Sequence, residues 1–312
     1  MDSEQHRSEM HRRDFLKRAS LGAAAVSAPG AAQAAPPPTM RRDTRLPAVT
    51  LGDRQVTRLI AGYNPIGGYS HFNRYLSRHM REYFTVDRTV EFLAHCEELG
   101  INTWQLDLNE KTMAILDKRR KQGTQMNFLC LHGNRPTDEP LEKLKEYGAF
   151  AVAHHGGVTD AKFRGGRAEE VHDYVKRVHD LGLLAGVSSH NPANVRQVAG
   201  EDWENDFFMT CFHHVSRTKA EMEAEFGTAM VGEPFVEADP VRMTEVIRQV
   251  DKPCLAFKIL AAGRKCDNRG VVGRAFKWAF QNIKPGDAVI VGMFPREEDQ
   301  VKEDVEHTRL YA

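Results

Sequence analysis

Short apolar and β-branched runs alternate with amphipathic segments along most of the chain. Such runs predict buried strands, and the amphipathic segments between them predict helices that cover the strands. The alternation repeats eight times. The predicted strands are residues 58–62, 101–106, 126–132, 150–155, 183–188, 207–212, 254–258 and 288–291.

Capping residues support the helices between these strands. Thr85 suits the N-cap of a helix, and Gly100 and Gly182 suit positions just after a helix. Proline in the first helical turn marks further starts. It predicts helices that begin at Asn191-Pro192, at Asp239-Pro240 and at Pro295.

Repeated strand and helix units imply parallel strands with right-handed crossovers, which form either a closed barrel or an open doubly wound sheet. Eight units of similar size favour closure. No Gly-x-Gly-x-x-Gly follows an early strand, so the dinucleotide-binding open sheet lacks its usual support. The sequence therefore predicts an α/β fold, a single (β/α)8 TIM barrel over residues 48–312.

The first 35 residues have a different character. Arg12-Arg13 is followed by Phe15-Leu16-Lys17, by a weakly apolar run over residues 19–32, and by Ala32-Gln33-Ala34, which suits a cleavage site. This segment resembles a bacterial twin-arginine signal peptide. Its serines, glycines and proline leave no strongly apolar stretch long enough to span a membrane.

The resemblance implies that the twin-arginine translocase exports the folded protein and that the protein works in the periplasm. Residues 36–47 begin with Pro36-Pro37-Pro38 and are predicted to be a stiff linker. The alternative is a disordered basic tail with a chance Arg-Arg pair.

The charge balance and the cysteine content limit the kinds of partner and of disulfide pairing that the chain suits. The chain has 43 basic and 43 acidic residues among 312, so its formal net charge is zero. A balanced charge without a basic stripe argues against nucleic acid and favours a small-molecule substrate. The five cysteines form no Cys-x-x-Cys pair, and their odd number excludes complete pairing within the chain.

Four fragments are similar to one known superfamily. Residues 51–64 include Leu-Gly and Ile-Ala-Gly-Tyr-Asn, residues 99–103 are Leu-Gly-Ile-Asn-Thr, residues 186–190 are Gly-Val-Ser-Ser-His, and residues 289–292 are Val-Ile-Val-Gly. In this order they resemble the aldo/keto reductases, from about Leu51 to the C-terminus. The resemblance implies a (β/α)8 barrel and, as one hypothesis, an NADP-dependent oxidoreductase.

The reductase residues that the resemblance implies are only partly present. The family has an acidic residue after its second strand, then a tyrosine, a lysine on the third strand and usually a histidine on the fourth. Gln105 or Asp107 stands near the acidic position, and His155 keeps the histidine. The next segment, 108–111, has no tyrosine, and the third strand ends in His132 without lysine. The usual proton donor is therefore missing.

Reacting groups of (β/α)8 enzymes project from the C-terminal ends of the strands. Four successive predicted strands end in or next to histidine. His155 and His190 are predicted to be the catalytic acid and base, and Lys258 to stabilise charge. Lysine at the rim paired with a carboxylate is the alternative for Lys258. Of the adjacent pairs His154-His155 and His213-His214, at most one member faces the mouth, because neighbours on a strand point to opposite faces.

Other strand-end residues predict a metal and a substrate site. The predicted metal ligands are His132, His213 and His214, because imidazoles at a barrel mouth suit zinc, iron or manganese. Each of them is alternatively a hydrogen-bonded wall residue. The predicted substrate-binding residues are Asn64, Gln105, Asp107 and Arg264.

Gly292, a helix start at Pro295 and Arg296 together predict a phosphate nest, where NADP would bind. A plain helix start with an exposed arginine is the alternative. Two long loops, over residues 63–83 and 221–237, are predicted to cover the mouth.

Three functions remain open from the sequence. The first is an exported enzyme that uses strand-end His and Lys residues for proton transfer or metal-assisted chemistry on a small carbonyl or carbohydrate, as an isomerase, lyase or hydrolase. The second is an oxidoreductase with prebound NADP. The third is a noncatalytic barrel that binds a sugar or a protein partner.

Overall fold

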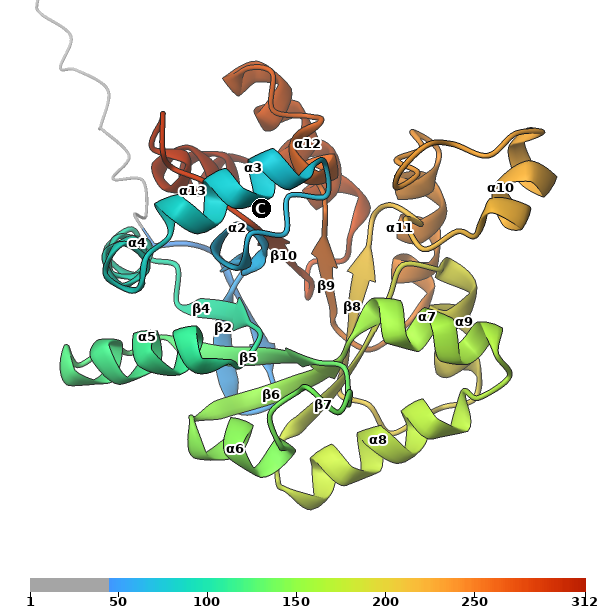
Figure 1. The fold of residues 1–312 in the computed structure, drawn as a ribbon, viewed down its shortest axis with the longest axis horizontal. Coiled ribbons are helices and arrows are strands. Elements are labelled where there is room, and N and C mark those ends of the chain that lie inside the picture. The colour runs from blue at the N-terminus through green and yellow to red at the C-terminus, as the bar shows by residue number, and fades with distance from the viewer. Residues whose placement is uncertain (1–44) are drawn as a thin grey trace, which may run out of the picture. The chain divides into compact units, whose positions relative to one another are not determined.

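Eight parallel strands close into one barrel in the computed structural model, which describes residues 45–312 (Figure 1). The signal-peptide prediction and most of the linker prediction lie outside the described residues. The barrel closes where β10 pairs with β3, with Ile290 opposite Ile60. The strands are β3 (Leu59–Ala61), β4 (Thr103–Leu106), β5 (Asn127–His132), β6 (Ala149–His154), β7 (Leu184–Ser189), β8 (Phe207–Cys211), β9 (Cys254–Phe257) and β10 (Ala288–Val291).

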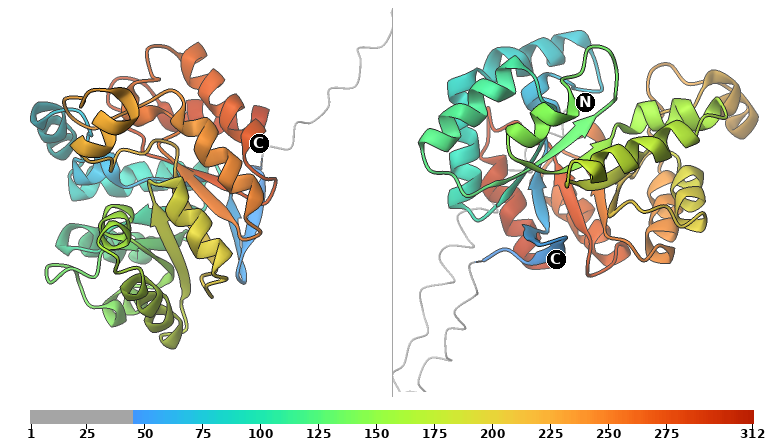
Figure 2. Two further views of the ribbon diagram at one scale, coloured as in Figure 1. Left: turned by 90° about the vertical axis from the view of Figure 1, so that its right-hand side faces the viewer. Right: turned by 90° about the horizontal axis from the view of Figure 1, so that it is seen from below.

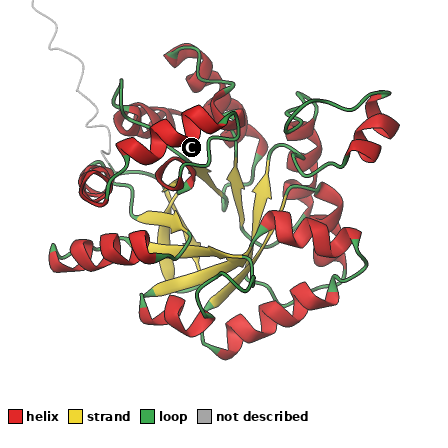
Figure 3. Ribbon diagram, viewed as in Figure 1, coloured by secondary structure: helices red, strands yellow, loops and turns green. Residues whose placement is uncertain are grey.

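All eight predicted strands are confirmed, and their ends agree within two residues. Helices surround them (Figure 3). The helices are α2 (Asn64–Gly67), α3 (Arg74–Tyr83), α4 (Val86–Glu98), α5 (Glu110–Lys121), α6 (Leu141–Glu146), α7 (Gly156–Arg164), α8 (Glu169–Asp180), α9 (Pro192–Gly200), α10 (Lys219–Phe226), α11 (Asp239–Gln249), α12 (Arg269–Asn282) and α13 (Gln300–Tyr311), with a short 3-10 turn at Ala261–Gly263.

The capping predictions are confirmed where α4 and α9 begin. The Thr85 side chain accepts from the backbone N–H of Arg88, and the Asn191 side chain accepts from that of Ala193. The start of the last helix was predicted wrongly. Residues 295–298 form a turn and a bend, and α13 begins at Gln300 with Asp299 as its N-cap.

A β-hairpin of β1 (Ala48–Leu51) and β2 (Arg54–Thr57) precedes the barrel and was not predicted. Its side chains Val49, Leu51 and Val56 belong to the same buried cluster as the barrel interior. The left panel of Figure 2 shows the hairpin, in blue, at the end of the barrel away from α10. The hairpin therefore fills the end of the barrel opposite the loops that follow the strands.

Side chains alternate between two buried layers. Leu129, Ala151 and Met209 belong to the interior cluster, whereas Cys130, Val152 and Phe208 belong to the layer beneath the helices. This alternation is the period of two expected for strands, and it fixes which strand-end residues point into the barrel mouth. None of the helices within residues 45–312 has the length and apolar character needed to cross a bilayer.

Candidate active site

Strand alternation places His155 and His190 on the inward side of the barrel. His155 continues the inward positions Ala151 and Ala153 of β6, and His190 follows the inward position of Leu184 on β7 by six residues. The His190 ring meets the ring of Phe257, at the end of β9, edge to face with centroids 5.7 Å apart. Both predicted catalytic histidines therefore lie at the mouth.

A buried carboxylate orients His190. Oδ2 of Asp160, on α7, lies 2.8 Å from the His190 Nδ1, and the Asp160 side chain is only 1% exposed. Its Oδ1 accepts from the Ser189 hydroxyl at 2.6 Å and from the Asn194 amide at 3.0 Å. Burial is the largest single influence and would raise the pKa of Asp160, but the hydrogen bond and charge of His190, together with the hydrogen bonds from neighbouring serines, hold the pKa below its usual value. Asp160 is thus an anion that accepts a hydrogen bond from the Nδ1–H of His190.

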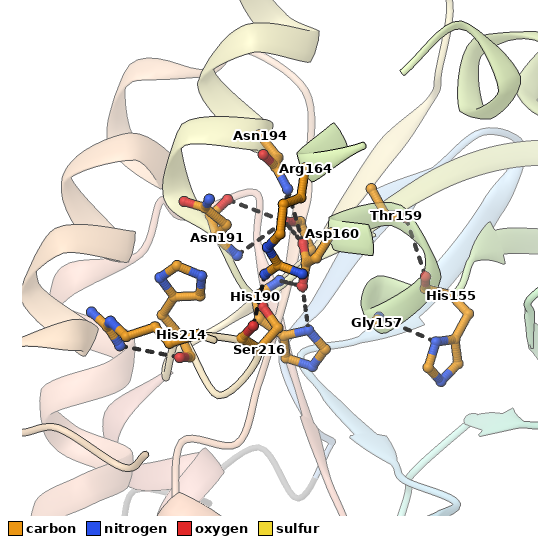
Figure 4. A network of polar contacts seen from close by, with 12 residues as sticks. His155, Gly157, Thr159, Asp160, Arg164, His190, Asn191, Asn194, His214 and Ser216 are labelled. Carbon is orange, nitrogen blue, oxygen red and sulfur yellow. Dashed lines mark hydrogen bonds and ion pairs between the residues drawn. The ribbon is translucent and has the colours of Figure 1, made fainter. Parts of the chain in front are cut away.

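The opposite nitrogen of His190 is available for chemistry. In the neutral form of His190 with its proton on Nδ1, Nε2 has a lone pair, and this nitrogen makes no hydrogen bond within residues 45–312. Figure 4 shows the His190 ring beside Asp160, which Asn194 also contacts. This pairing was not predicted, because Asp160 lies on the helix after His155 and nothing in the sequence links it to the following strand.

His155 has the opposite proton assignment. It is the N-cap of α7, and its Nδ1 accepts the backbone N–H of Gly157 at 3.2 Å. Burial, together with the nearby charge of Arg135, lowers the pKa of His155 to about 4, so the ring is neutral near pH 7. A neutral ring whose Nδ1 accepts has its proton on Nε2. That Nε2–H makes no hydrogen bond within the described residues and is left to donate to a bound molecule.

The two histidines are neighbours in space. A Cβ atom added to Gly156, the residue after His155, would lie 3.1 Å from Cε1 of His190. The absence of a side chain at Gly156 makes room for the close approach of His190 to the start of α7. The charge of His190 also lies near enough to His155 to contribute to the lowered pKa of the His155 imidazole.

Lys258 is the third residue that the sequence predicts for the chemistry. It follows β9 in a left-handed conformation with φ of 59°. Its Nζ lies 3.2 Å from Nε2 of His71, which belongs to the loop between α2 and α3. Its charge lies near enough to His155 to lower the pKa of that imidazole further. No carboxylate accepts directly from Nζ among the hydrogen bonds of the described residues, so the rim ion pair is not what the structure contains.

The predicted substrate-binding residues have different places. Gln105 and Asp107 lie on the inward side of β4 and just after it, since Trp104 and Leu106 pack in the outer layer. Burial raises the pKa of Asp107 to about 7. The Asn64 amide donates to Nε2 of His71 at 3.0 Å. Arg264 is engaged with the loops, donating to the backbone oxygen of His71.

The predicted metal centre is not formed. His132 points outward from β5, where its Nδ1 lies 2.7 Å from the Tyr174 hydroxyl and its Nε2 lies 3.0 Å from the Glu139 carbonyl oxygen. His213 and His214 follow β8, and the His213 ring packs beside Phe235. Within residues 45–312 no group of three or more His, Cys, Asp or Glu side chains is arranged to hold a metal ion. The outward parity of His132 is the reason, and we derive no step through a metal.

The predicted phosphate nest is not formed either. Gly292 packs against the ring of Pro65, where a Cβ atom would lie 2.6 Å from Cδ. Arg296 lies on a turn and pairs with Glu297 at 3.2 Å. The N-terminus of α13 is occupied by its own cap, Asp299, whose side chain accepts from Lys302.

The surface around Arg296 is also unsuited to a phosphate. It borders a cleft of about 400 Å³ whose lining has more carboxylates than basic side chains. The lining is Tyr83, Arg88, Glu91, Phe92, His95, Pro295, Arg296, Glu297, Glu298 and Asp299. Carboxylates there would repel a phosphate group.

Within residues 45–312, the tyrosine nearest the end of β3 does not have the properties of a reductase proton donor. Tyr63 lies two residues after β3, its hydroxyl accepts from the Asn109 amide, and burial raises its pKa to about 12. A phenol that donates a proton during hydride transfer needs a lowered pKa. Tyr63 therefore does not match the proton donor that NADP-dependent reduction would need.

No family model and no curated protein matches the sequence. Several solved structures have a similar backbone fold. A glycerol dehydrogenase from Gluconobacter oxydans shares 12% identity over 84% of this chain and 94% of its own, with a TM-score of 0.49. A truncated 3-deoxy-D-arabino-heptulosonate 7-phosphate synthase from Thermotoga maritima shares 15% over 86% and 91%, with a TM-score of 0.46. An aldo/keto reductase from Brucella melitensis shares 14% over 84% and 93%, with a TM-score of 0.44. Identities this low concern the fold alone.

Proposed function

We propose that the protein is an enzyme that transfers a proton at the carbon next to a carbonyl group, as an isomerase, epimerase or lyase does. The observation that supports this is the pair of opposite tautomers at the mouth. His190 presents a lone pair backed by Asp160, and His155 presents an N–H donor. Removal of a carbon-bound proton needs a base for the proton and a donor for the oxygen that becomes negative.

The proposed reaction begins when Nε2 of His190 takes the proton from the carbon. The imidazolium that forms is stabilised by the Asp160 carboxylate, which already accepts a hydrogen bond from Nδ1–H. The Nε2–H of His155 donates to the carbonyl oxygen, and a neutral imidazole suits this role because its own proton is only partly given up. The ammonium of Lys258 stabilises the enolate charge. Return of the proton to the neighbouring carbon completes an isomerisation.

The proposed substrate is a small hydroxycarbonyl compound, such as a sugar. The polar side chains of Gln105 and Asp107 on the inward side of β4 suit its hydroxyl groups. Asp107, with a pKa of about 7, is able to donate as well as accept a hydrogen bond near neutral pH. The chemistry needs no cofactor at the turn that contains Arg296.

The test is proton exchange with solvent. The purified protein is incubated in D2O with a panel of small hydroxyaldehydes and hydroxyketones, and the carbon-bound proton is followed by 1H NMR. We expect exchange with at least one member of the panel. His190→Gln should reduce the rate by about 10²- to 10⁴-fold, the usual contribution of a general base.

His179→Gln is the matched control. His179 also pairs with a carboxylate at 2.8 Å, that of Asp206, but this pair lies where the chain enters β8, away from the mouth. The control should exchange at the wild-type rate. If no compound exchanges, or if both variants lose the same activity, the proposal fails.

A further inference from the structure

Three loops meet at Lys258 from distant parts of the chain. His71 belongs to the loop between α2 and α3, Glu233 to the loop between α10 and α11, and Lys258 follows β9. Nδ1 of His71 lies 2.9 Å from both carboxylate oxygens of Glu233, and its Nε2 lies 3.2 Å from Nζ of Lys258. Only the position of Lys258 was predicted to take part in chemistry.

The direction of these hydrogen bonds is fixed by Lys258. An ammonium group only donates, so Nε2 of His71 accepts from it. The Asn64 amide lies 3.0 Å from the same Nε2. Nδ1 therefore has the proton and donates to Glu233, and burial lowers the pKa of His71, which keeps this ring neutral. The chain Glu233, His71, Lys258 thus holds the ammonium by one of its three protons.

Backbone strain is concentrated at the same place. His71 and Lys258 both have positive φ, 54° and 59°, although neither is glycine. Such conformations are strained for residues with a side chain and persist where the surrounding structure determines them. Ala261 and Ala262, three and four residues after Lys258, also have positive φ. The loop after β9 is therefore bent in a way that directs Lys258 toward His71.

A second contact joins the same loops. The guanidinium of Arg264 lies 3.8 Å from the ring centroid of Phe235 and 5.7 Å from that of Phe72. It also donates to the backbone oxygen of His71 at 3.1 Å. Arg264 thus connects the loop that contains Phe72 with the loop that contains Phe235 and Glu233.

We infer that Glu233 and His71 are positioning residues that hold the Lys258 ammonium over the active site, and that their contact joins the two covering loops there. The role of Lys258 in turnover rests on the proposed function. The positioning of its ammonium does not, and the experiment separates the two.

Reductive methylation of lysines, read by mass spectrometry, measures how firmly Lys258 is held. His71→Asn is suitable because asparagine tolerates a positive φ better than most residues. We expect Lys258 to be methylated several-fold faster in His71→Asn and in Glu233→Ala than in the wild type. Glu233→Gln keeps an oxygen that accepts from Nδ1 and should retain the wild-type rate.

Lys111 serves as the internal reference, since its Nζ donates to the backbone oxygen of Ile66 at 2.8 Å and takes no part in the chain. Its rate should be equal in all four proteins. Equal Lys258 rates in the wild type, His71→Asn and Glu233→Ala would overturn the inference, whatever the protein catalyses.

Exchange kinetics test the consequence for turnover. With a substrate from the D2O panel, His71→Asn should lower kcat on the order of 10²-fold with little change in KM, because a misplaced catalytic group loses rate rather than binding. His79→Asn, on α3 with its ring beside Phe294, should leave both constants unchanged. A raised KM at wild-type kcat would instead make His71 a binding residue and contradict the positioning role. Failure of every compound to exchange would count against the proposed function alone, since the methylation result stands without it.

Discussion

The tautomer of a histidine is decided by what its Nδ1 atom touches. At His155 a backbone N–H donates to that atom, and at His190 a carboxylate accepts from it. Two side chains of one type therefore present opposite faces to a substrate. The difference comes from the helix N-terminus at His155 and from Asp160, which comes from the same helix but reaches the next strand.

Asp160→Asn tests the carboxylate at this scale. The Asn amide would donate to Nδ1 of His190, so the ring proton would move to Nε2 and the base would lose its lone pair. We expect the exchange rate in D2O to fall on the order of 10³-fold or more. Circular dichroism checks that the variant is folded, and wild-type exchange by a folded Asp160→Asn would contradict the role of Asp160.

Asp107→Asn tests the charge balance at the mouth. Burial raises the pKa of Asp107 from 3.8 to about 7 in the folded protein. Between these pH values the folded state binds more protons than the unfolded state, so this group makes stability fall as the pH rises. Asp107→Asn has no titrating group at this position and should not lose this stability as the pH rises.

The free energy of unfolding, measured with urea, should therefore rise in Asp107→Asn relative to the wild type as the pH increases from 3.8 to about 7. The gain is at most about 1.4 kcal/mol per pH unit, and it should level off above that range. A difference independent of pH would show that Asp107 is not protonated in the folded state.

The secondary-structure elements explain which parts of the fold and of the candidate site the sequence predicts. The eight strands were found because a barrel strand is a short apolar run between helices. The mouth positions of His155 and His190 were predictable because these residues end such strands, but the same rule wrongly placed His132 at the mouth. Its neighbours Leu131 and Gly133 give no sign of which face is inward, and one residue of register reverses the outcome. Asp160, His71 and Glu233 come from loops and a helix, where no period indicates direction.

The hairpin of β1 and β2 escaped the sequence analysis because it is short and stands outside the repeat. Val56→Ala should nevertheless destabilise the barrel by about 1–3 kcal/mol, since Val56 is fully buried in the interior cluster. Urea unfolding measures this. Thr50→Ala on the exposed side of the same hairpin is the control and should change stability by less than about 0.5 kcal/mol. Equal effects would mean that the hairpin does not pack into the barrel.

At the scale of the whole molecule, closure of the barrel brings residues from β6, β7 and β9 to one opening. The thiols of the described residues are all free, and four of the five are buried. Burial raises the pKa of each buried thiol, for example to about 12 for Cys211 and Cys254, so these thiols stay protonated and unreactive. Such a domain needs no disulfide and suits export in the folded state, which we propose from the twin-arginine segment.

Export has its own test. Replacing Arg12 and Arg13 by lysine should keep the precursor in the cytoplasm of a bacterium with a twin-arginine translocase, because the translocase recognises the arginine pair. Cell fractionation followed by immunoblotting measures the distribution. Normal appearance of the double variant in the periplasm would contradict the proposed route.

The most direct measurement of the central claim is the protonation of the two rings at the mouth. Long-range 1H–15N NMR of protein with 15N-labelled histidine identifies the nitrogen that has the proton, and His155→Gln and His190→Gln assign the signals. We predict Nε2–H for His155 and Nδ1–H for His190 at neutral pH. The same tautomer on both rings, or a doubly protonated His155, would contradict the account.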